Sequence, residues 1–542
     1  MASSNKRVAD VIAERLAHEC SFAFGVPGGE VLTLIDALRI AGIRFVLSRH
    51  ETSAGFMAEG TQRVLGGVGV LVATLGPGVA NTVNIVSHAQ QARRPLIVLT
   101  GCASAGDRGS YTHQIFDHRA VLAPITKAQF EVAAESVQDT IERAVVTAIS
   151  GVPGPVHVEV PVDVADALVA VQKRRRPARS PAGVLPSEVF ERAKLALEKA
   201  KRPVILAGLE LLHGGGAAAL RRHAERVRWP VLTTYEAKGI VQEGTPPAVA
   251  AIGLSERVDR IALALVAEAD LVLLAGYDPI EVRHRWRHPF PENATVVDVT
   301  RQPAQHGMHR SDMCLEGEPA AILDALFESV SPTEWTTEPE QALRSVRALF
   351  AYSPSDEQAW GPEDVLRTLE EETPANAIVT VDTGAHRILL CEQWRFAEPG
   401  HLFQSNGLCT MACAIPLALG AKLAAPTRPV VAVVGDGGLE MALGELGTAR
   451  DEGLPVVIVV LDDRSLALIE KKQRQRSFEN VGVDFGHDDN FAGTDYAAIA
   501  RAFGGRGERV HTDADLRAAL ATAFSGEVFT LIHCPVPRRA YG

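Results

Sequence analysis

Two aspartates are the first residues of this sequence whose types and spacing suggest chemistry. Asp436 stands in a Gly-Asp-Gly-Gly segment after the apolar run 430–434, and Asp463, 27 positions later, follows a second apolar run. This spacing accommodates one helix between two parallel strands, which end at the same edge of a sheet. Carboxylate oxygens suit a hard cation such as Mg²⁺, and glycines let backbone N–H groups approach an anion. The pattern therefore predicts a divalent cation that bridges to a diphosphate.

Buried strands must hold these residues, and the chain supplies such strands throughout. Short apolar runs rich in β-branched residues, such as 96–100, 271–275 and 430–434, alternate with longer periodic segments. Runs of this kind are typical of parallel sheets covered by helices on both faces. We therefore expect an α/β protein with three doubly wound parallel-sheet domains.

Two stretches divide the chain into three blocks. Residues 171–183 combine a basic run with prolines, and residues 329–341 combine prolines with acidic residues. Both are typical of solvated connectors. The predicted domains are residues 1–175, 186–330 and 355–542, each of ordinary domain size. No sequence repeat relates them.

The composition narrows the class of protein. The 542-residue chain is 46% hydrophobic and 22% charged, as a globular protein should be. Its net charge of −12 leaves no basic surplus for phosphates, so we do not expect nucleic acid as a partner. Seven cysteines without metal-ligand spacing indicate free thiols in a reducing compartment. The N-terminus has no apolar signal region and no uncharged run is long enough for a bilayer, so we expect a cytoplasmic protein without a membrane partner.

The Gly-Asp-Gly segment and the later carboxylate resemble the fingerprint of the thiamine-diphosphate-dependent enzymes, in which Asn or Asp follows about 27 residues after Gly-Asp-Gly. The resemblance implies thiamine diphosphate and Mg²⁺ as cofactors. It assigns the metal to the side chains of Asp436 and Asp463 and to the backbone carbonyl of Ser465. The usual Asn at the start of the second pair is Asp462 here, which adds negative charge near a diphosphate.

Glu51 resembles the family's activating glutamate. It follows Arg-His and precedes a helix rich in small residues. In the family this carboxyl group hydrogen-bonds the aminopyrimidine ring of the cofactor and so helps to form the reactive carbanion. Taken alone, a glutamate at this place is more often a charge at a helix N-terminus.

Further segments of the two outer blocks resemble the family, which divides into pyrimidine-binding, central and diphosphate-binding domains. Met411 would lie under the bend of the cofactor, the carbonyl of Cys409 would accept its amino group, and Ile469 would stand beside the reactive carbon. Otherwise a methionine in an apolar helix is core filler. The cofactor-binding residues implied are Pro27, Gly28, Gly76, Asn81, Gly384, Ala385, His386, Cys409, Met411, Gly435, Gly437, Gly438, Leu468 and Ile469.

Within the family, residues 112–127, 275–286 and 481–486 are most similar to the catabolic, flavin-independent acetolactate synthases. The resemblance gives Gln114 a catalytic role in holding the substrate carboxylate or the hydroxyl of a covalent intermediate. His113 is a weaker candidate for proton relay, with a surface or structural histidine as the alternative.

The activity implied is decarboxylation of a 2-keto acid, followed by carboligation of the remaining unit to a second carbonyl compound. A non-ligating 2-keto acid decarboxylase and an aldehyde or acyl-CoA lyase are alternatives, and a non-catalytic cofactor-binding subunit is a remote one. Lys472 departs from the pattern, since the synthases carry Trp or Gln there. It could bind an acceptor carboxylate, or it could point to solvent and pair with Glu470.

The resemblance also implies partners. The first domain of one subunit faces the third domain of the other, so we expect a homodimer with shared active sites, which could pair into a tetramer. The glycine-rich segment 207–220 could follow a nucleotide-binding strand, but a lone turn of this kind is weak evidence. We therefore do not expect FAD.

Overall fold

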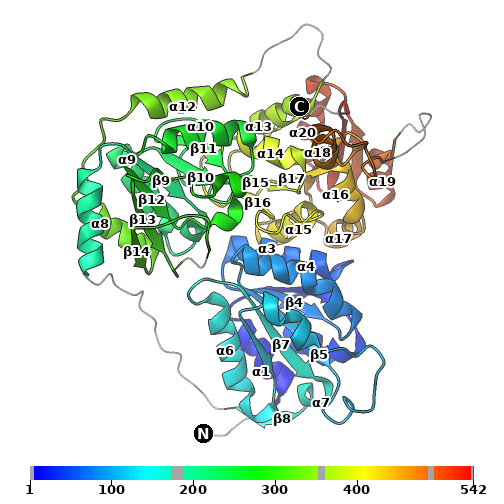
Figure 1. Cartoon of the computed structure of the whole chain (residues 1–542). Coiled ribbons are helices and arrows are strands. Elements are labelled where there is room, and N and C mark those ends of the chain that lie inside the picture. The colour runs from blue at the N-terminus through cyan, green and yellow to red at the C-terminus, as the bar shows by residue number, and fades with distance from the viewer. Residues whose placement is uncertain are drawn as a thin grey trace.

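The structure is a computed structural model that describes residues 5–171, 187–303, 306–351, 360–485, 493–538 and 541. The chain forms three α/β domains, each built on a six-stranded parallel sheet. In Figure 1 the N-terminal domain (blue to cyan) lies below the central domain (green) and the C-terminal domain (yellow to red). The predicted fold class is confirmed. The connector expected over 171–183 falls, from residue 172 on, outside the described residues.

The N-terminal sheet has the strand order β3-β2-β4-β5-β7-β6. Its strands are Phe22–Val26 (β2), Arg44–Leu47 (β3), Gly69–Ala73 (β4), Leu96–Cys102 (β5), Ala128–Glu131 (β6) and Pro155–Pro161 (β7), and a small antiparallel pair joins Asn5–Arg7 (β1) to Leu168–Ala170 (β8). The helices are Val8–Leu16 (α1), Leu32–Ile40 (α2), Glu51–Leu65 (α3), Pro77–Gln91 (α4), His118–Leu122 (α5), Val137–Ile149 (α6) and Val162–Ala165 (α7).

The C-terminal sheet repeats this topology, with the order β16-β15-β17-β18-β20-β19. Its strands are Ile378–Val381 (β15), Leu402–Gln404 (β16), Val430–Gly435 (β17), Val457–Asp462 (β18), Arg506–Arg509 (β19) and Thr530–Pro535 (β20). The helices are Pro362–Glu372 (α13), Ala385–Gln393 (α14), Ala414–Ala424 (α15), Asp436–Met441 (α16), Glu445–Asp451 (α17), Ala467–Gln475 (α18), Tyr496–Ala502 (α19) and Asp513–Phe524 (α20). The two outer domains therefore share one fold although no sequence repeat relates them.

The central sheet has a different order, β11-β10-β9-β12-β13-β14. Its strands are Pro203–Ala207 (β9), Val231–Thr234 (β10), Ala248–Ile252 (β11), Leu271–Ala275 (β12), Thr295–Thr300 (β13) and Met313–Glu316 (β14). The helices are Glu188–Lys199 (α8), Gly216–Val227 (α9), Glu256–Val266 (α10), Pro319–Leu326 (α11) and Thr337–Ala348 (α12).

The connector expected over 329–341 is only partly one. From Thr337 the chain forms helix α12, which packs against α10 and β11 of the central domain. Its buried face consists of Pro339, Ala342, Leu343 and Val346, spaced as an amphipathic helix requires. The prolines and acidic residues that suggested a linker lie in the first turn of this helix and just before it, where both are favourable.

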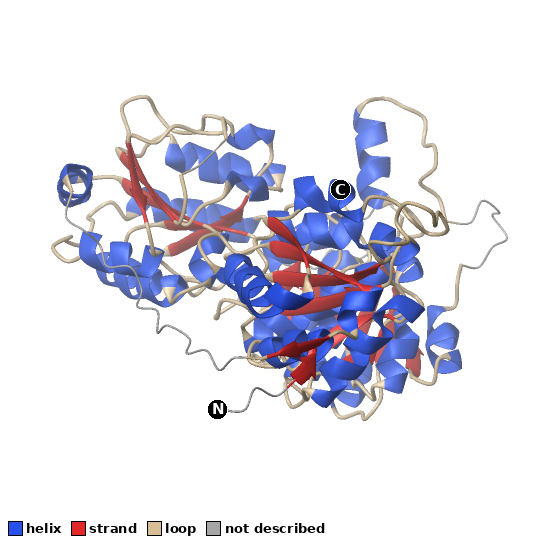
Figure 2. Cartoon of the chain, turned by 90° about the horizontal axis from the view of Figure 1, so that it is seen from below, coloured by secondary structure: helices blue, strands red, loops and turns tan. Residues whose placement is uncertain are grey.

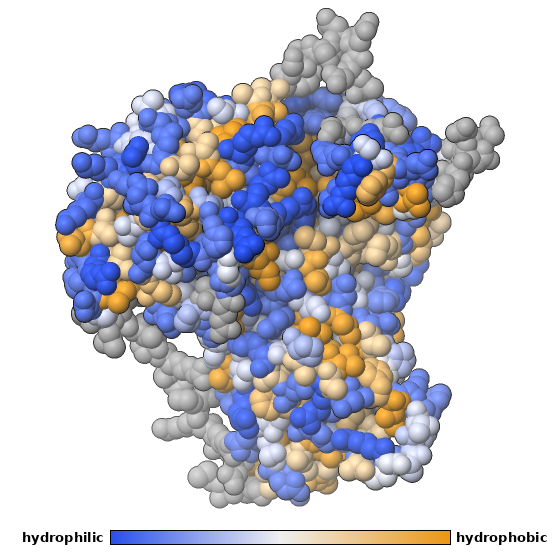
Figure 3. Space-filling view, viewed as in Figure 1, coloured by the Kyte–Doolittle hydropathy of each residue, from blue (hydrophilic) through white to orange (hydrophobic). Residues whose placement is uncertain are grey.

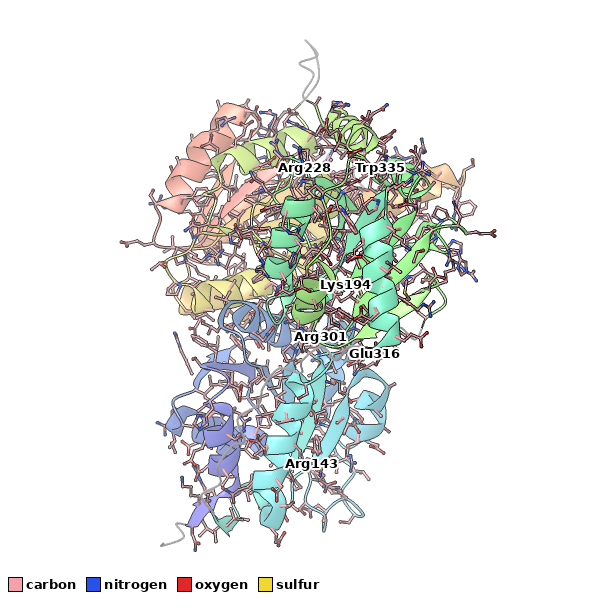
Figure 4. The ribbon with its side chains drawn as sticks, turned by 90° about the vertical axis from the view of Figure 1, so that its left-hand side faces the viewer. Arg143, Lys194, Arg228, Arg301, Glu316 and Trp335 are labelled. Atoms are coloured by element: carbon pink, nitrogen blue, oxygen red, sulfur yellow. The ribbon has the colours of Figure 1, made fainter. Side chains whose placement is uncertain are left out.

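Helices cover both faces of each sheet, which explains the apolar strands. Every residue of β4, β5 and β7 is buried, and so is every residue of β18. Figure 2 shows the red strands enclosed between layers of blue helices. Figure 4 shows two helices of the outer layer on one side of the molecule, α6 with Arg143 and α8 with Lys194.

The outside of the molecule is mixed in character. Figure 3 shows mainly hydrophilic residues over the upper domains and more apolar surface on the N-terminal domain below. Within the described ranges, no helix is both long and apolar enough to cross a membrane.

Helices α3 and α15 make the closest contact between the outer domains. Almost all of α3 is buried up to Gln62, and α15 is buried from Ala414 to Leu423. Glycines let the two backbones meet, because a Cβ at Gly60 would lie 2.4 Å from the carbonyl oxygen of Leu417 and one at Gly420 would lie 2.1 Å from that of Met57. No real side chain fits at such distances.

A buried ion network joins the three domains beside this contact. Glu236 of the central domain pairs with Arg63 (3.1 Å) and Arg94 (2.9 Å) of the N-terminal domain. Glu59 lies 2.8 Å from His88, whose other ring nitrogen is 2.9 Å from Ser405 Oγ in the C-terminal domain. Because unpaired buried charges cost several kcal/mol, the domains must dock in the arrangement that pairs them.

We predict that Gly420→Ala lowers the free energy of unfolding by about 1–3 kcal/mol, although alanine is intrinsically the better helix former. The cause is the overlap of the new Cβ with the carbonyl oxygen of Met57. Urea unfolding followed by circular dichroism measures the change. Gly29→Ala is the control, since a Cβ there has no neighbour within 4 Å. Equal stability of the two variants would show that α3 and α15 can separate without cost.

Candidate active site

The strand order of the C-terminal sheet reverses between β15 and β17, and ligands of doubly wound sheets bind at such a point. Gly384 caps the N-terminus of α14 after β15, and Gly435, the last residue of β17, caps the N-terminus of α16. The ring of His386 lies between these turns, because a Cβ at Gly384 would be 2.5 Å from its Cε1 and one at Gly435 would be 3.1 Å away. Burial lowers the pKa of His386 to about 4, so the imidazole is neutral at pH 7.

Asp436 and Asp463 follow the neighbouring strands β17 and β18, as the sequence predicts. Each is 4% exposed. One oxygen of each carboxyl accepts a backbone N–H, from Gly437 (2.8 Å) and from Ser465 (3.1 Å). Among the described residues, the second oxygen of each has no hydrogen-bond partner. Burial, together with mutual repulsion, raises the pKa of Asp436 to about 8, and burial raises that of Asp463 to about 7.

These two unsatisfied oxygens fit a divalent cation, which would replace the repulsion by attraction. Across the described ranges, no group of three or more His, Cys, Asp or Glu side chains is arranged for a metal. The remaining ligands would therefore be backbone, water or diphosphate oxygens, as is usual for Mg²⁺. Ser465 is buried beside the pair, and its hydroxyl donates to Glu470 (2.6 Å). Its carbonyl as a ligand stays a prediction.

The glycines after Asp436 are required by close packing. A Cβ at Gly438 would lie 1.8 Å from Asp382 Oδ2, and one at Gly437 would lie 2.9 Å from the ring of Phe485. The backbone of the first turn of α16 therefore packs directly against the side chains of Asp382 and Phe485. Ala385, the first residue of α14, is half-buried.

Asp382 and Arg387 build the loop that carries Cys409 and Met411, and the sequence analysis missed both. The carboxylate of Asp382 accepts the backbone N–H groups of Ala412 and Cys413, each at 2.9 Å, and burial raises its pKa. Arg387 donates to the carbonyl of Ser405 and to Cys409 Sγ (3.2 Å). Asp382 follows a buried strand just as Asp436 does, and that signal could have revealed it.

This loop has a constrained backbone. Cys409 has φ +56° and Ala412 has φ +66°, values that residues with a side chain rarely adopt. Cys409 is exposed and Met411 is half-buried between them. Strained backbone of this kind often marks a site that holds a ligand in a fixed shape.

The N-terminal domain presents a second group of the predicted residues. Glu51 is the first residue of α3 and is 7% exposed. Its Oε2 accepts a hydrogen bond from Asn81 Nδ2 on α4 (2.9 Å). Pro27 is exposed after β2, and Gly28 packs on Thr74, whose Oγ1 would lie 2.2 Å from a Cβ there. The sequence patterns around Glu51 and Asn81 thus converge in space.

Gln114 lies over the start of α4. Gly76 caps that helix with φ +67°, and a Cβ on it would be 2.5 Å from the carbonyl oxygen of Gln114. Gln114 itself has φ +60° and is exposed. His113 is also exposed, with its ring 6.2 Å from that of Tyr111.

His118 and Glu159 hold the Gly76 turn before α4 in place, and the sequence analysis did not identify them. The backbone N–H of Gly76 donates to His118 Nε2 (3.1 Å), and the other ring nitrogen of His118 lies 3.0 Å from Glu159. No motif links these two residues, since they are 41 positions apart.

Helix α18, which follows β18 and Asp463 in the chain, forms one wall of a cavity of about 380 Å³. Leu468 and Lys472 line it together with Ala385. Ile469, on the same helix, is 44% exposed. Glu470 is buried, and its carboxylate also pairs with Arg538 (3.2 Å).

Family models match all three domains. Residues 6–121 match the N-terminal TPP-binding domain of thiamine pyrophosphate enzymes, residues 190–326 match the central domain, and residues 382–534 match the C-terminal TPP-binding domain.

Curated proteins match over nearly the whole chain. A probable acetolactate synthase large subunit of Methanocaldococcus jannaschii is 31% identical over 94% of this chain and 88% of its own length. The acetolactate synthase of Bacillus subtilis is 28% identical, covering 98% and 93%. A probable 2-ketoarginine decarboxylase of Pseudomonas aeruginosa is 32% identical, covering 89% and 85%.

We predict that Mg²⁺ raises the Tm more at pH 8 than at pH 5. In the folded protein the pKa values of Asp436 and Asp463 lie above the value of about 4 that aspartate has in the unfolded chain. The protonated carboxyl groups therefore make their full contribution to stability only below about pH 4. Without a cation it is lost as the pH rises through about 7 and 8. Differential scanning calorimetry measures both effects.

Asp463→Ala, which removes both side-chain oxygens, should abolish most of the Mg²⁺ effect, whereas Asp36→Ala on the surface should leave it unchanged. A Mg²⁺ shift that survives Asp463→Ala would place the cation elsewhere.

Proposed function

Because the chain belongs to the thiamine pyrophosphate enzyme family, we propose that it decarboxylates a 2-keto acid with thiamine diphosphate and Mg²⁺ and joins the remaining unit to a second carbonyl compound. The reaction would resemble that of the acetolactate synthases named among its relatives. The observation that carries the proposal is a pair of buried carboxyl oxygens, on Asp436 and Asp463, that have no hydrogen-bond partner in the described part of the chain and lie at the reversal point of a TPP-binding domain.

The residues of the C-terminal domain would hold the cofactor's charged end. Asp436, Asp463 and the carbonyl of Ser465 would bind Mg²⁺, and the backbone N–H groups at the start of α14 and α16 would bind the diphosphate. His386, being neutral, can accept or donate a hydrogen bond there without adding charge. When bound, thiamine diphosphate supplies the carbanion chemistry by which a 2-keto acid loses CO₂.

Glu51 would exchange a proton with the ring nitrogen of the aminopyrimidine. Its hydrogen bond from Asn81 fixes the orientation of the carboxyl group, and burial at the start of α3 keeps water from competing. Gln114, held over Gly76, would reach the reacting carbonyl from the N-terminal domain, as Glu51 does. Leu468 and Ile469 would form the apolar wall near the reacting atoms.

A non-ligating decarboxylase is the second candidate. It is favoured by the similarity to a protein named as a probable 2-ketoarginine decarboxylase and by Lys472. FAD is not part of the proposal, because the backbone N–H of Leu209, in the glycine-rich turn after β9, already donates to Glu281 (3.2 Å).

We propose further that the active site is shared within a homodimer. Among the described residues, no hydrogen bond or ion pair joins Glu51 to Asp436, Asp463 or His386 of the same chain. Exposed apolar side chains lie near both groups of residues. They are Tyr111, Phe116 and Val121 near Gln114, and Met441, Ile469, Phe478 and Val481 in the C-terminal domain.

Product analysis by NMR tests the activity, with Mg²⁺, thiamine diphosphate and pyruvate as the only substrate. We expect acetolactate; acetaldehyde alone would favour the second candidate. Glu51→Gln should bind the cofactor normally, because the diphosphate site is untouched, yet lose turnover about 100- to 10,000-fold. Near-normal turnover in that variant would remove Glu51 from the mechanism. Cofactor binding without CO₂ release from any 2-keto acid would indicate a non-catalytic subunit.

Subunit complementation tests the shared site. Glu51→Gln and Asp436→Asn chains should each be nearly inactive, since each lacks one half of every site. When the two chains are refolded together in equal amounts, about a quarter of the wild-type activity should return, because half of the dimers are mixed and each has one intact site. No recovery, despite mixed dimers detected by mass spectrometry, would contradict shared sites.

A further inference from the structure

The cavity of about 380 Å³ beside α18 lies between the central and C-terminal domains. Its walls come from the start of α10, from the segment after β12, and from α14 and α18. Figure 1 shows α10, α14 and α18 as neighbours along the upper side of the molecule. Leu468 and Ala385 belong both to this cavity and to the candidate active site.

Basic side chains dominate the lining. Four arginines and two lysines line the cavity, against three glutamates. The basic residues are Arg257, Arg260, Arg283, Arg285, Lys471 and Lys472, and the acidic ones are Glu256, Glu363 and Glu392. A surplus of one charge in a cavity concentrates ligands of the opposite charge, since low-dielectric walls focus the field.

The glutamates neutralise only part of this charge. Glu256 lies 3.7 Å from Arg260 and 3.4 Å from Arg285. Glu392 lies 3.9 Å from Arg257, but burial raises its pKa to about 8, which favours the uncharged form at pH 7. The pKa of Glu363 is raised by burial too.

Arg283 and Lys472 remain available. Within the described residues, neither has a carboxylate within 4 Å of its charged nitrogens. Arg283 is half-buried on the central-domain wall, and Lys472 is exposed on α18 opposite it. The buried Asp259 lies 3.6 Å from Arg285 and also attracts Arg283, but burial raises its pKa and so opposes its charged form. The positive charge of Arg283 is therefore only partly balanced, which favours an anionic ligand.

We propose that this cavity binds the far end of the substrate, and that the substrate is a 2-keto acid with a second anionic group, such as a carboxylate, sulfonate or phosphonate. The inference rests on the proposed function, since it assigns a substrate class to the same site. The reacting keto acid would enter past Leu468, and its second anion would pair with Arg283 and Lys472. A keto acid with a cationic side chain would be repelled.

Isosteric substrate pairs test the proposal in the enzyme loaded with Mg²⁺ and thiamine diphosphate. 2-Oxoglutarate is compared with 5-methyl-2-oxohexanoate, and 3-sulfopyruvate and 3-phosphonopyruvate are each compared with 4,4-dimethyl-2-oxopentanoate, with CO₂ release as the readout. For at least one dianion we expect a kcat/KM about 10- to 100-fold higher than that of its isostere, whose far end is uncharged. One charged hydrogen-bonded contact provides a difference of this size. The preferred dianion identifies the anionic group.

Arg283→Met should remove most of that preference while leaving the uncharged isostere unaffected. Arg222→Met is the matched control, an exposed arginine of the central domain that pairs with Asp324 and should change nothing. Equal kcat/KM within each pair, or a preference that survives Arg283→Met, would overturn the proposal.

A binding measurement separates this proposal from the proposed function. Glutarate cannot react but carries two carboxylates, and its calorimetric affinity should fall about 10-fold or more in Arg283→Met. If no 2-keto acid releases CO₂, the proposed function fails, while an Arg283-dependent affinity for glutarate still supports the anion site. Glutarate binding that ignores Arg283 would overturn the anion site, whatever the turnover.

Discussion

The direct backbone contact of α3 with α15 is the constraint on which the rest of the structure depends. Gly60 and Gly420 let the two helices approach more closely than any side chain allows. Glu51 begins one helix, and the loop of Met411 leads into the other. The separation of the helices therefore fixes how the Glu51 end of the N-terminal domain and the Met411 loop of the C-terminal domain are placed within one chain, and so how each half-site would face a partner subunit.

The buried ion network then fixes the central domain against this pair. Arg63 lies on α3 and binds Glu236 of the central domain, and it also donates to the carbonyl of Leu402 (2.9 Å) and covers the ring of Phe403 (4.1 Å). Replacing such a network by apolar residues often costs nothing in stability, so its value lies in specificity of docking. Because the arginine-lined cavity has walls from two domains, its width follows from this docking.

Much of the fold could be predicted from the sequence, because buried parallel strands are continuous apolar runs. The strand order could not, since it depends on contacts between residues far apart in the chain. Asp436 and Asp463 were found because one motif fixes their spacing, although two short helices, α16 and α17, connect the strands instead of the single helix expected. Arg387 and His118 were missed because they act through backbone groups of distant segments, which leave no local pattern. Asp382 does follow a buried strand, but no Gly-Asp-Gly motif there drew attention to that position.

The cavity was equally hidden in the sequence. Lys472 was noted alone, as a departure from a pattern, while Arg283 stands nearly two hundred positions earlier in a different domain. Only the docking of the central domain against the C-terminal domain brings the two side chains to the same cavity. Helix α12 was mistaken for a connector because its prolines and acids are also what a helix start favours.

The shared strand order of the outer domains has a consequence for the origin of the chain. Gly60 meets Leu417 while Gly420 meets Met57, so residues 360 positions apart exchange places across the contact. The same offset relates Glu51 to Met411. In an isologous dimer two copies of one chain contact each other in this reciprocal way, whereas here both partners belong to one polypeptide. It indicates that an ancestral domain first paired with its own copy and that gene duplication later tethered the two. The positions of Glu51 and Met411, for which we propose proton exchange and cofactor support, would then be two descendants of one ancestral residue.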